Sequence, residues 1–176
     1  MPDELQSVLE PLDQVVDHVR GPEGAKSILE YGDYECPYSR AAYRSIERVE
    51  AQLDGKMRFA FRHFPLTRIH PHALAASLAA EAASLQGRFW EMHDTLFHSQ
   101  KALEDDDLRR YASELRLDVK RFDEDRRSEP VVERIERDIR SAIASDEVLG
   151  TPTLFIDGVP HSGGYDEHTL LRVLES

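Results

Sequence analysis

The chain lacks several features that whole classes of protein need. It contains a single cysteine, Cys36, in 176 residues, so no disulfide can form within it. A reducing compartment fits that composition. No apolar stretch approaches the roughly 20 residues that span a bilayer. The acidic start, Met1–Glu4, has neither the basic nor the apolar segment of a signal peptide. We therefore expect a cytoplasmic protein.

The chain is also short of positive charge. Lysine and arginine number 22 against 34 aspartates and glutamates, which gives a formal net charge of -12 at pH 7. Such a surface repels phosphate backbones and anionic lipid headgroups. We therefore expect neither nucleic acid nor a membrane as a partner. A neutral, thiol-bearing or basic partner is expected instead.

The composition is otherwise that of a single globular domain over residues 1–176. Hydrophobic residues make up 40% of the chain and charged residues 32%, which is enough for one domain with a core of its own. The sequence shows no internal repeat. It also shows no phosphate-binding loop, dinucleotide fingerprint or serine-hydrolase motif.

The first third of the chain reads as β-α-β. Residues 1–13 are polar and are expected to form an ordered arm or a short helix. Strands are predicted at Val15–Val19, Ala25–Asp33 and Met57–Phe64, the last from its period-two alternation of apolar and polar residues. Between the second and third of them, Pro37–Leu53 repeats its apolar residues every three or four positions, which predicts an amphipathic helix.

The middle of the chain, about residues 67–146, shows helical patterns and no convincing strand. An alanine-rich run predicts a helix over His72–Gln86. Apolar spacing predicts three more, at Phe89–Phe97, Leu108–Leu115 and Val131–Ala144. We expect these four helices to form a helical insertion that covers the rest of the fold.

The end of the chain returns to strands. Thr153–Ile156 and Val159–His161 are predicted strands on either side of an Asp157-Gly158 turn. A final helix is predicted at Asp166–Leu174. The chain is therefore an α/β protein in which a β-α-β unit and a β-β-α unit flank a block of helices.

Cys36 occupies a position suited to chemistry. It follows an apolar strand pattern and precedes a predicted helix, with Pro37 at the first helical position, where its missing N–H has no partner to lose. Unpaired N–H groups and the helix dipole at this end favour the thiolate, which is the nucleophilic form. A hydroxyl at Ser39 is placed to donate a hydrogen bond to the sulfur, and Tyr38 is the other residue expected to tune the site. The alternative is a buried, unreactive cysteine.

Thr151-Pro152 is the second candidate site element. It lies between Gly150 and a predicted strand. An X-Pro bond adopts the cis form at modest cost, and a free backbone at Thr151 can pair with an extended substrate segment. The alternative is a trans proline that opens an edge strand.

Four segments in order resemble the DsbA-like branch of the thioredoxin superfamily, from about Ile28 to Leu174. They are Asp33-Tyr34-Glu35-Cys36-Pro37-Tyr38, Phe61-Arg62-His63-Phe64-Pro65-Leu66, His70-Pro71-His72-Ala73 and Gly150-Thr151-Pro152-Thr153-Leu154-Phe155-Ile156-Asp157-Gly158. The resemblance implies a thioredoxin fold with a helical insertion. It also implies a thiol-disulfide oxidoreductase in which Cys36 faces a cis-Pro152 across a substrate groove.

Ser39 departs from that family, which usually has a second cysteine at this position. One thiol cannot form an intramolecular disulfide, so we expect an oxidoreductase or isomerase that works through mixed disulfides. Cys36 and Ser39 are its expected catalytic residues, and Pro37, Tyr38, Thr151 and Pro152 its expected substrate-binding residues. Its expected partners are disulfide-containing or S-thiolated proteins.

We expect no tightly bound cofactor. A low-molecular-weight thiol such as glutathione is the expected co-substrate, unless the substrate's own thiol resolves the mixed disulfide. Two alternatives remain open. One is a redox-inactive domain that binds peptides in the Pro152 groove. The other is a glutathione-dependent transferase or isomerase of the kappa type, although such enzymes usually have serine where Cys36 stands.

No metal site is predicted. The pairs His70 with His72 and His93 with His98 do not place their side chains on one helical face. His63, at the end of a predicted strand, is expected to make a buried hydrogen bond.

Overall fold

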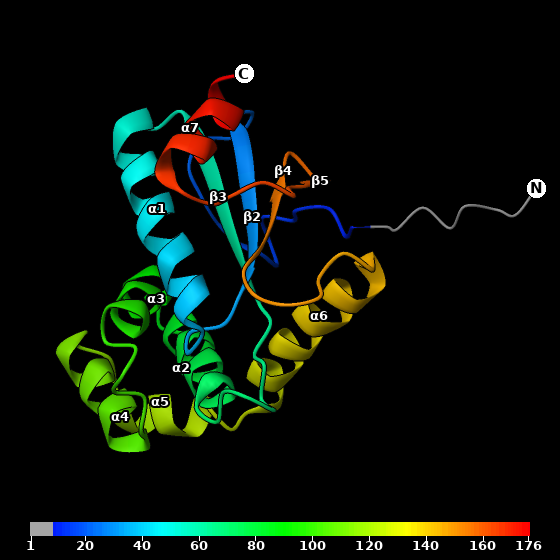
Figure 1. The fold of residues 1–176 in the computed structure, drawn as a ribbon. Helices are drawn as coiled ribbons and strands as arrows, with labels where there is room; N and C mark the ends of the chain where they lie inside the picture. Colours follow the sequence, from blue (N-terminus) through cyan, green and yellow to red (C-terminus); the bar gives the residue numbers. More distant parts are fainter. Residues whose placement is uncertain (1–8) are drawn as a thin grey trace, which may run out of the picture.

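The computed structural model describes residues 9–176 (Figure 1). Their strands form one five-stranded sheet in the order β1-β3-β2-β4-β5. Its strands are β1 (His18–Arg20), β2 (Lys26–Gly32), β3 (Met57–His63), β4 (Thr153–Ile156) and β5 (Val159–Pro160). The helices are α1 (Pro37–Leu53), α2 (Ala73–Ser84), α3 (Phe89–His98), α4 (Asp105–Glu114), α5 (Val119–Asp125), α6 (Glu129–Ser145) and α7 (Glu167–Glu175).

The sheet joins the two ends of the chain. β2 pairs with β3 in parallel, as a β-α-β unit requires, and β4 adds antiparallel to the other edge of β2. The helices α2 to α6 all lie between β3 and β4 in the sequence. The α/β thioredoxin fold with its helical insertion is thus confirmed.

Side chains of β2 alternate between the two faces of the sheet. Ile28 packs in the larger core with α1, α7 and the insertion, whereas Leu29 and Tyr31 pack in a smaller core with Ala142 of α6. Figure 1 shows α1 and α7 side by side over the sheet, with α6 set apart from them. Both faces are therefore covered, which explains why the neighbouring residues Ile28 and Leu29 are both apolar.

Helix α1 has the predicted bounds because its ends are well marked. Pro37 begins it, and Asp54 closes it in the left-handed conformation (φ 39°), with its N–H donated to the Glu50 carbonyl at 3.0 Å. Ala42, Ile46 and Val49 form its buried face. The cysteine that precedes Pro37 is held at the end of a rigid element.

The predicted strand near the N-terminus was wrong in its first residues. The expected strand at Val15–Val19 begins only at His18. Asp13 accounts for the delay, because its carbonyl and carboxylate accept N–H bonds from the next residues and close a turn that leaves Val15 exposed. Of the expected arm, residues 1–8 lie outside the described part of the chain, and 9–13 contain no helix.

The helical insertion contains five helices where four were predicted. The additional helix, α5, is short, and its start is capped by Asp118, whose carboxylate accepts the N–H of Arg121 at 3.0 Å. Phe122 is its one buried residue. A seven-residue helix with a single core contact has too little periodicity to stand out in the sequence.

A buried ion pair fixes the segment before β1 to the sheet. Arg62 of β3 is fully buried and donates two hydrogen bonds of 2.9 Å to the carboxylate of Asp17. A third bond from Arg62 reaches the Tyr31 hydroxyl at 2.8 Å. Burial alone would raise the pKa of Asp17, but hydrogen bonds from Arg62 and Arg137 outweigh it and lower that pKa.

Within residues 9–176, every helix is too short or too polar to span a lipid bilayer.

Candidate active site at the start of helix α1

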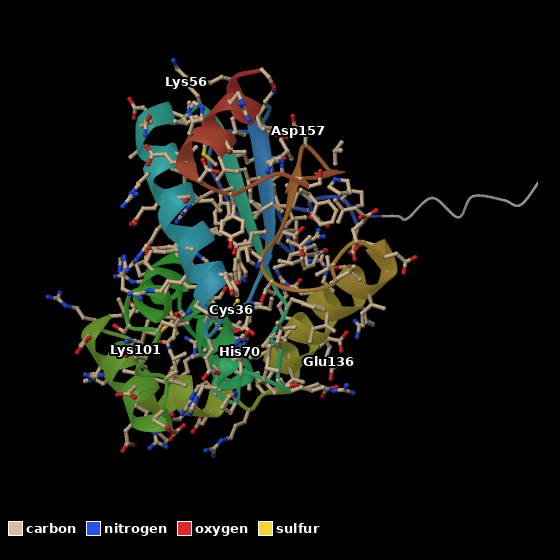
Figure 2. All side chains as sticks on the ribbon, viewed as in Figure 1. Cys36, Lys56, His70, Lys101, Glu136 and Asp157 are labelled. Carbon is tan, nitrogen blue, oxygen red and sulfur yellow. The ribbon has the colours of Figure 1, made fainter. Side chains whose placement is uncertain are left out.

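Cys36 is the N-cap residue of α1, at the end of the helix nearest the helical insertion (Figure 2). No side chain caps this helix end, so the N–H groups of its first turn are available to a charged group near the sulfur. The Cys36 side chain is nearly buried, with 3% of the residue exposed.

The structure brings Thr151 to the sulfur. The Cys36 thiol donates a weak hydrogen bond to the Thr151 carbonyl, with 3.4 Å between sulfur and oxygen. The peptide bond from Thr151 to Pro152 is cis. The two motifs, 115 residues apart in the sequence, thus form one site.

Ser39 is buried one turn into α1, and its hydroxyl accepts the backbone N–H of Asp33 at 3.2 Å. Within residues 9–176 the structure records no hydrogen bond from Ser39 to the sulfur, contrary to our expectation. The hydroxyl instead joins the first turn of α1 to the end of β2. Ser39 therefore supports the loop that carries Cys36.

Two hollows adjoin this site. One, of about 330 Å³, is lined by Pro152, Thr153, His161 and Tyr165 among others. The second, of about 410 Å³, is lined by Pro37 together with residues of the helical insertion. Both offer contact surface for a chain segment that approaches the sulfur.

The predicted binding residues differ in exposure. Tyr38 is 64% exposed and Pro37 is exposed beside it, so both present surface to an incoming molecule. Thr151 and Pro152 are half-buried, and the Thr151 hydroxyl is a buried polar group without a hydrogen-bond partner among the described residues.

The loop from Asp33 to Cys36 is fixed from two sides. The buried carboxylate of Asp33 accepts the N–H groups of Glu35 at 2.8 Å and Leu66 at 2.9 Å, and it bonds to His70 Nδ1 at 2.7 Å. From the helical insertion, the Gln100 amide donates to the carbonyls of Tyr34 at 2.9 Å and Cys36 at 2.8 Å. The position of the sulfur thus depends on both parts of the fold.

A histidine between two carboxylates borders the Pro37 hollow. His72 bonds through Nδ1 to Glu35 at 2.9 Å and through Nε2 to Glu104 at 3.0 Å. The hydrogen bond to Glu35 is the largest cause of the raised pKa of His72; burial opposes it, and the hydrogen bond to Glu104 adds to it. The His70-Pro71-His72 motif therefore anchors the loop of residues 33–36, called the active-site loop below, through Asp33 and Glu35.

Sequence reasoning missed two residues of this region, Glu30 and Tyr165. Glu30 of β2 is fully buried, and neither carboxylate oxygen has a partner among the described residues. Burial raises its pKa from the usual 4.5 to about 8, against a smaller opposing effect of Arg20. The available signal was a single acidic residue within the apolar run Ile28–Tyr31.

Tyr165 lies close enough to the sulfur for their charges to interact. Burial is the largest cause of its raised pKa, and negative charge on Cys36, Tyr38 and Glu30 adds to it. Tyr165 therefore keeps its proton at neutral pH beside Cys36. It sits in the loop before α7, where the sequence offers only glycines and a single aromatic residue as a signal.

A thioredoxin-type sheet with a cysteine at the first turn of α1 and a cis-proline opposite defines a class of proteins. Residues 13–176 match the family described as Thioredoxin, and the chain belongs to that family.

Solved structures share the fold of this chain. A thioredoxin-like oxidoreductase from Silicibacter pomeroyi is 25% identical with a TM-score of 0.78, and 90% of each chain is covered. BdbD from Bacillus subtilis is 20% identical with a TM-score of 0.79, and 92% of each chain is covered. The alpha-DsbA1 protein of Wolbachia pipientis is 23% identical with a TM-score of 0.78, over 95% of this chain and 92% of the other. The fold is DsbA-like.

Curated relatives are longer proteins. The protein named Na(+)/H(+) antiporter NhaA 1 of Mycolicibacterium gilvum is 44% identical over 96% of this chain, and the one named Na(+)/H(+) antiporter NhaA of Herminiimonas arsenicoxydans is 45% identical over 98%. The match covers 28% of the length of each. The chain therefore corresponds to about a quarter of these relatives.

Proposed function

We propose that this protein catalyses thiol-disulfide exchange with Cys36 as its one reacting sulfur. The observation that carries the proposal is the position of that sulfur, at the uncapped start of α1 and 3.4 Å from the carbonyl that precedes Pro152. The first-turn N–H groups stabilise the thiolate. The backbone at Thr151 lies beside it, where an extended substrate segment can pair.

The reaction has two exchange steps. The Cys36 thiolate attacks one sulfur of a substrate disulfide, forms a mixed disulfide with that half, and releases the other half as a thiolate. A second thiolate then attacks the mixed disulfide, and Cys36 leaves as a thiolate. One disulfide bond is broken and one is formed in each step, so no external oxidant is needed.

The second thiol comes from outside the chain, because the chain has no other cysteine. A small thiol such as glutathione, in a reducing compartment such as the cytoplasm, gives deglutathionylation of proteins. A thiol of the substrate itself gives disulfide isomerisation. The exposed Tyr38 and the hollow beside Pro152 are the surfaces that contact the substrate in this proposal.

The test is a trapping experiment with a glutathionylated peptide. We expect intact mass spectrometry to show a glutathione adduct on the wild-type protein and none on Cys36→Ser. Added glutathione should remove the adduct and give multiple turnovers. In addition, iodoacetamide should modify Cys36 of the wild-type protein and leave the Cys36→Ser variant unmodified. An unmodified Cys36 under these conditions would refute the proposal.

A matched gain-of-function variant sharpens this test. Ser39→Cys restores a second thiol one helical turn from Cys36, and we expect it to form an internal disulfide and to reduce insulin, which the wild-type protein should not do. The Ser39→Ala variant is the control, since it removes the hydroxyl without adding a sulfur. Insulin reduction unchanged by Ser39→Cys would argue against this site.

A peptide-binding domain without turnover is the second candidate. It is favoured by the burial of Cys36, of which only 3% is exposed. In that case a disulfide-free extended peptide should bind to wild-type protein and to Cys36→Ser with equal affinity, and no adduct should form. The trapping experiment separates the two functions.

A further inference from the structure

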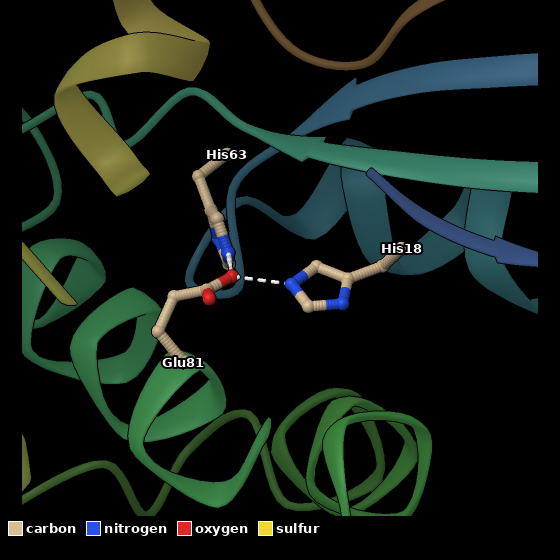
Figure 3. A group of neighbouring side chains, drawn as sticks. All are labelled: His18, His63 and Glu81. Atoms are coloured by element: carbon tan, nitrogen blue, oxygen red, sulfur yellow. Dashed lines mark hydrogen bonds and ion pairs between the residues drawn. The ribbon is translucent and has the colours of Figure 1, made fainter. Parts of the chain in front are cut away.

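Three side chains with metal-binding atoms converge where the sheet meets the helical insertion. Figure 3 shows His18 from β1, His63 from the end of β3 and Glu81 from α2 directed at one another. Glu81 Oε1 lies 2.6 Å from His18 Nε2 and 2.7 Å from His63 Nε2. The three candidate ligand atoms all lie within 4.8 Å of one another.

Packing fixes the direction of both imidazole rings. His63 is fully buried, and its ring meets that of Phe89 edge to face with 6.1 Å between centroids. The His18 ring is stacked on the same Phe89, with 3.5 Å between centroids and 5° between planes. His18 alone of the three retains appreciable contact with solvent, with 14% of its side chain exposed. A small ion can therefore reach the cluster from the His18 side.

The hydrogen-bonded arrangement has a simple route to a metal-bound one. Glu81 Oε1 only accepts, so each imidazole keeps a proton on Nε2 when it bonds to this oxygen. Moving those protons to the Nδ1 atoms exposes two nitrogen lone pairs and leaves the number of bound protons unchanged. Two lone pairs and a carboxylate oxygen then face a common point.

A first-row metal requires the three ligand atoms, now within 4.8 Å of one another, to take up one common spacing. Zinc lies about 2.0–2.2 Å from imidazole nitrogen and carboxylate oxygen, so tetrahedral geometry separates neighbouring ligand atoms by about 3.3 Å. The Glu81 oxygen needs to withdraw by roughly 0.6 Å from each nitrogen. Glutamate has the side-chain torsions to make that movement while α2 stays in place.

We propose that His18, His63 and Glu81 bind one zinc ion, with a fourth position for water on the His18 side. Two imidazoles and one carboxylate suit zinc, whereas calcium and magnesium require more oxygen ligands. The ion ties β1 and β3 to α2, and so joins the sheet to the helical insertion. The sequence predicts no metal site from the His70/His72 and His93/His98 spacings. It gives no sign of this cluster, because His18 and Glu81 lie 63 positions apart in the chain.

The site is separate from Cys36, and the proposal does not depend on the redox function. The two regions are nevertheless neighbours, since the His63 ring lies 5.9 Å from the ring of Tyr34, two residues before the cysteine. A chelator that removes zinc is therefore expected to lower the stability of the fold around the active-site loop.

The test is zinc titration of chelator-treated Cys36→Ser protein, whose one thiol is removed as a competing ligand. We expect calorimetry to show one zinc ion per chain and thermal unfolding to move to higher temperature with zinc. His18→Gln, whose amide can still donate to Glu81, should weaken zinc binding by at least about 100-fold, since loss of even an indirect partner of a ligand costs 10–100-fold. His168→Gln, on an exposed position of α7, is the matched control and should bind as before.

A measurement without a ligand variant covers the case in which His18→Gln does not fold. In nuclear magnetic resonance spectra, zinc should shift the Nε2 signals of His18 and His63 and leave that of His168 in place. The proposal is overturned if folded protein binds no zinc in a saturable way, if His18→Gln binds as tightly as its parent, or if the shifted signals belong to His72, which also lies between two carboxylates.

Discussion

Replacing Glu30 by glutamine should stabilise the protein at neutral pH. The unfolded chain ionises this carboxyl above its usual pKa of 4.5, whereas the folded protein keeps it protonated up to about pH 8 because it is buried without partners. A raised carboxyl pKa therefore costs no stability below pH 4.5. The cost grows as the pH rises from 4.5 to about 8 and is constant above that.

The magnitude follows from the two pKa values. Each pH unit in this window costs about 1.4 kcal/mol, so at pH 7 the ionisation of this carboxyl in the unfolded chain lowers the free energy of unfolding by about 3 kcal/mol. Glutamine has the same shape and never ionises. For a chain of this length the Glu30→Gln variant should melt roughly 6–12 °C above wild type at pH 7.

Urea unfolding of both proteins from pH 4 to pH 9 measures the effect. We expect the two free energies of unfolding to be similar at pH 4, to separate between pH 4.5 and 8, and to run parallel above. The lowered pKa of Asp17 contributes equally to both proteins and cancels in the difference. Glu114→Gln, an exposed position, is the control and should show no such separation. A difference for Glu30→Gln that does not change with pH would refute the argument.

Three further predictions concern stability and the active-site loop. Asp17→Asn leaves the buried Arg62 guanidinium uncompensated and should cost about 3 kcal/mol in urea unfolding, whereas a cost below about 1 kcal/mol would show that the pair contributes little. The ring of His72 should titrate above its usual 6.5 in nuclear magnetic resonance spectra, and Glu35→Gln should move that midpoint down; an unchanged midpoint would contradict the contact. Gln100→Ala removes two hydrogen bonds and should cost about 2 kcal/mol, with faster amide exchange in residues 34–36; unchanged exchange would show that the loop holds without them.

The sequence predicted the elements whose side chains repeat over several turns. Helix α1 has the predicted bounds because a proline begins it and apolar residues at helical spacing, among them Ala42, Ile46 and Val49, mark its buried face. The Cys36 and Thr151-Pro152 motifs could be recognised because each combines uncommon residue types within a few consecutive positions. Elements without such repetition, α5 above all, were missed.

Contacts between distant segments could not be predicted in the same way. Ser39 was expected to face the sulfur, yet it bonds to the backbone of Asp33, because a hydroxyl can satisfy either partner and packing decides between them. The pKa of Glu30 is raised only because β3 and β4 pair with β2 on either side and helices bury its side chain. Such properties arise from the assembled core and have no local pattern in the chain.

Through two hydrogen bonds from Gln100, the helical insertion helps to position the loop that carries Cys36. The side chain that holds the carbonyls of Tyr34 and Cys36 comes from the segment that follows α3, far in sequence from the strands and from the cysteine. Changes in that segment can therefore shift the backbone that carries Cys36 while the sheet and its motifs stay the same. Under the proposed function, homologues with the same cysteine motif and another residue at position 100 should differ in exchange rate, and comparing them tests this link.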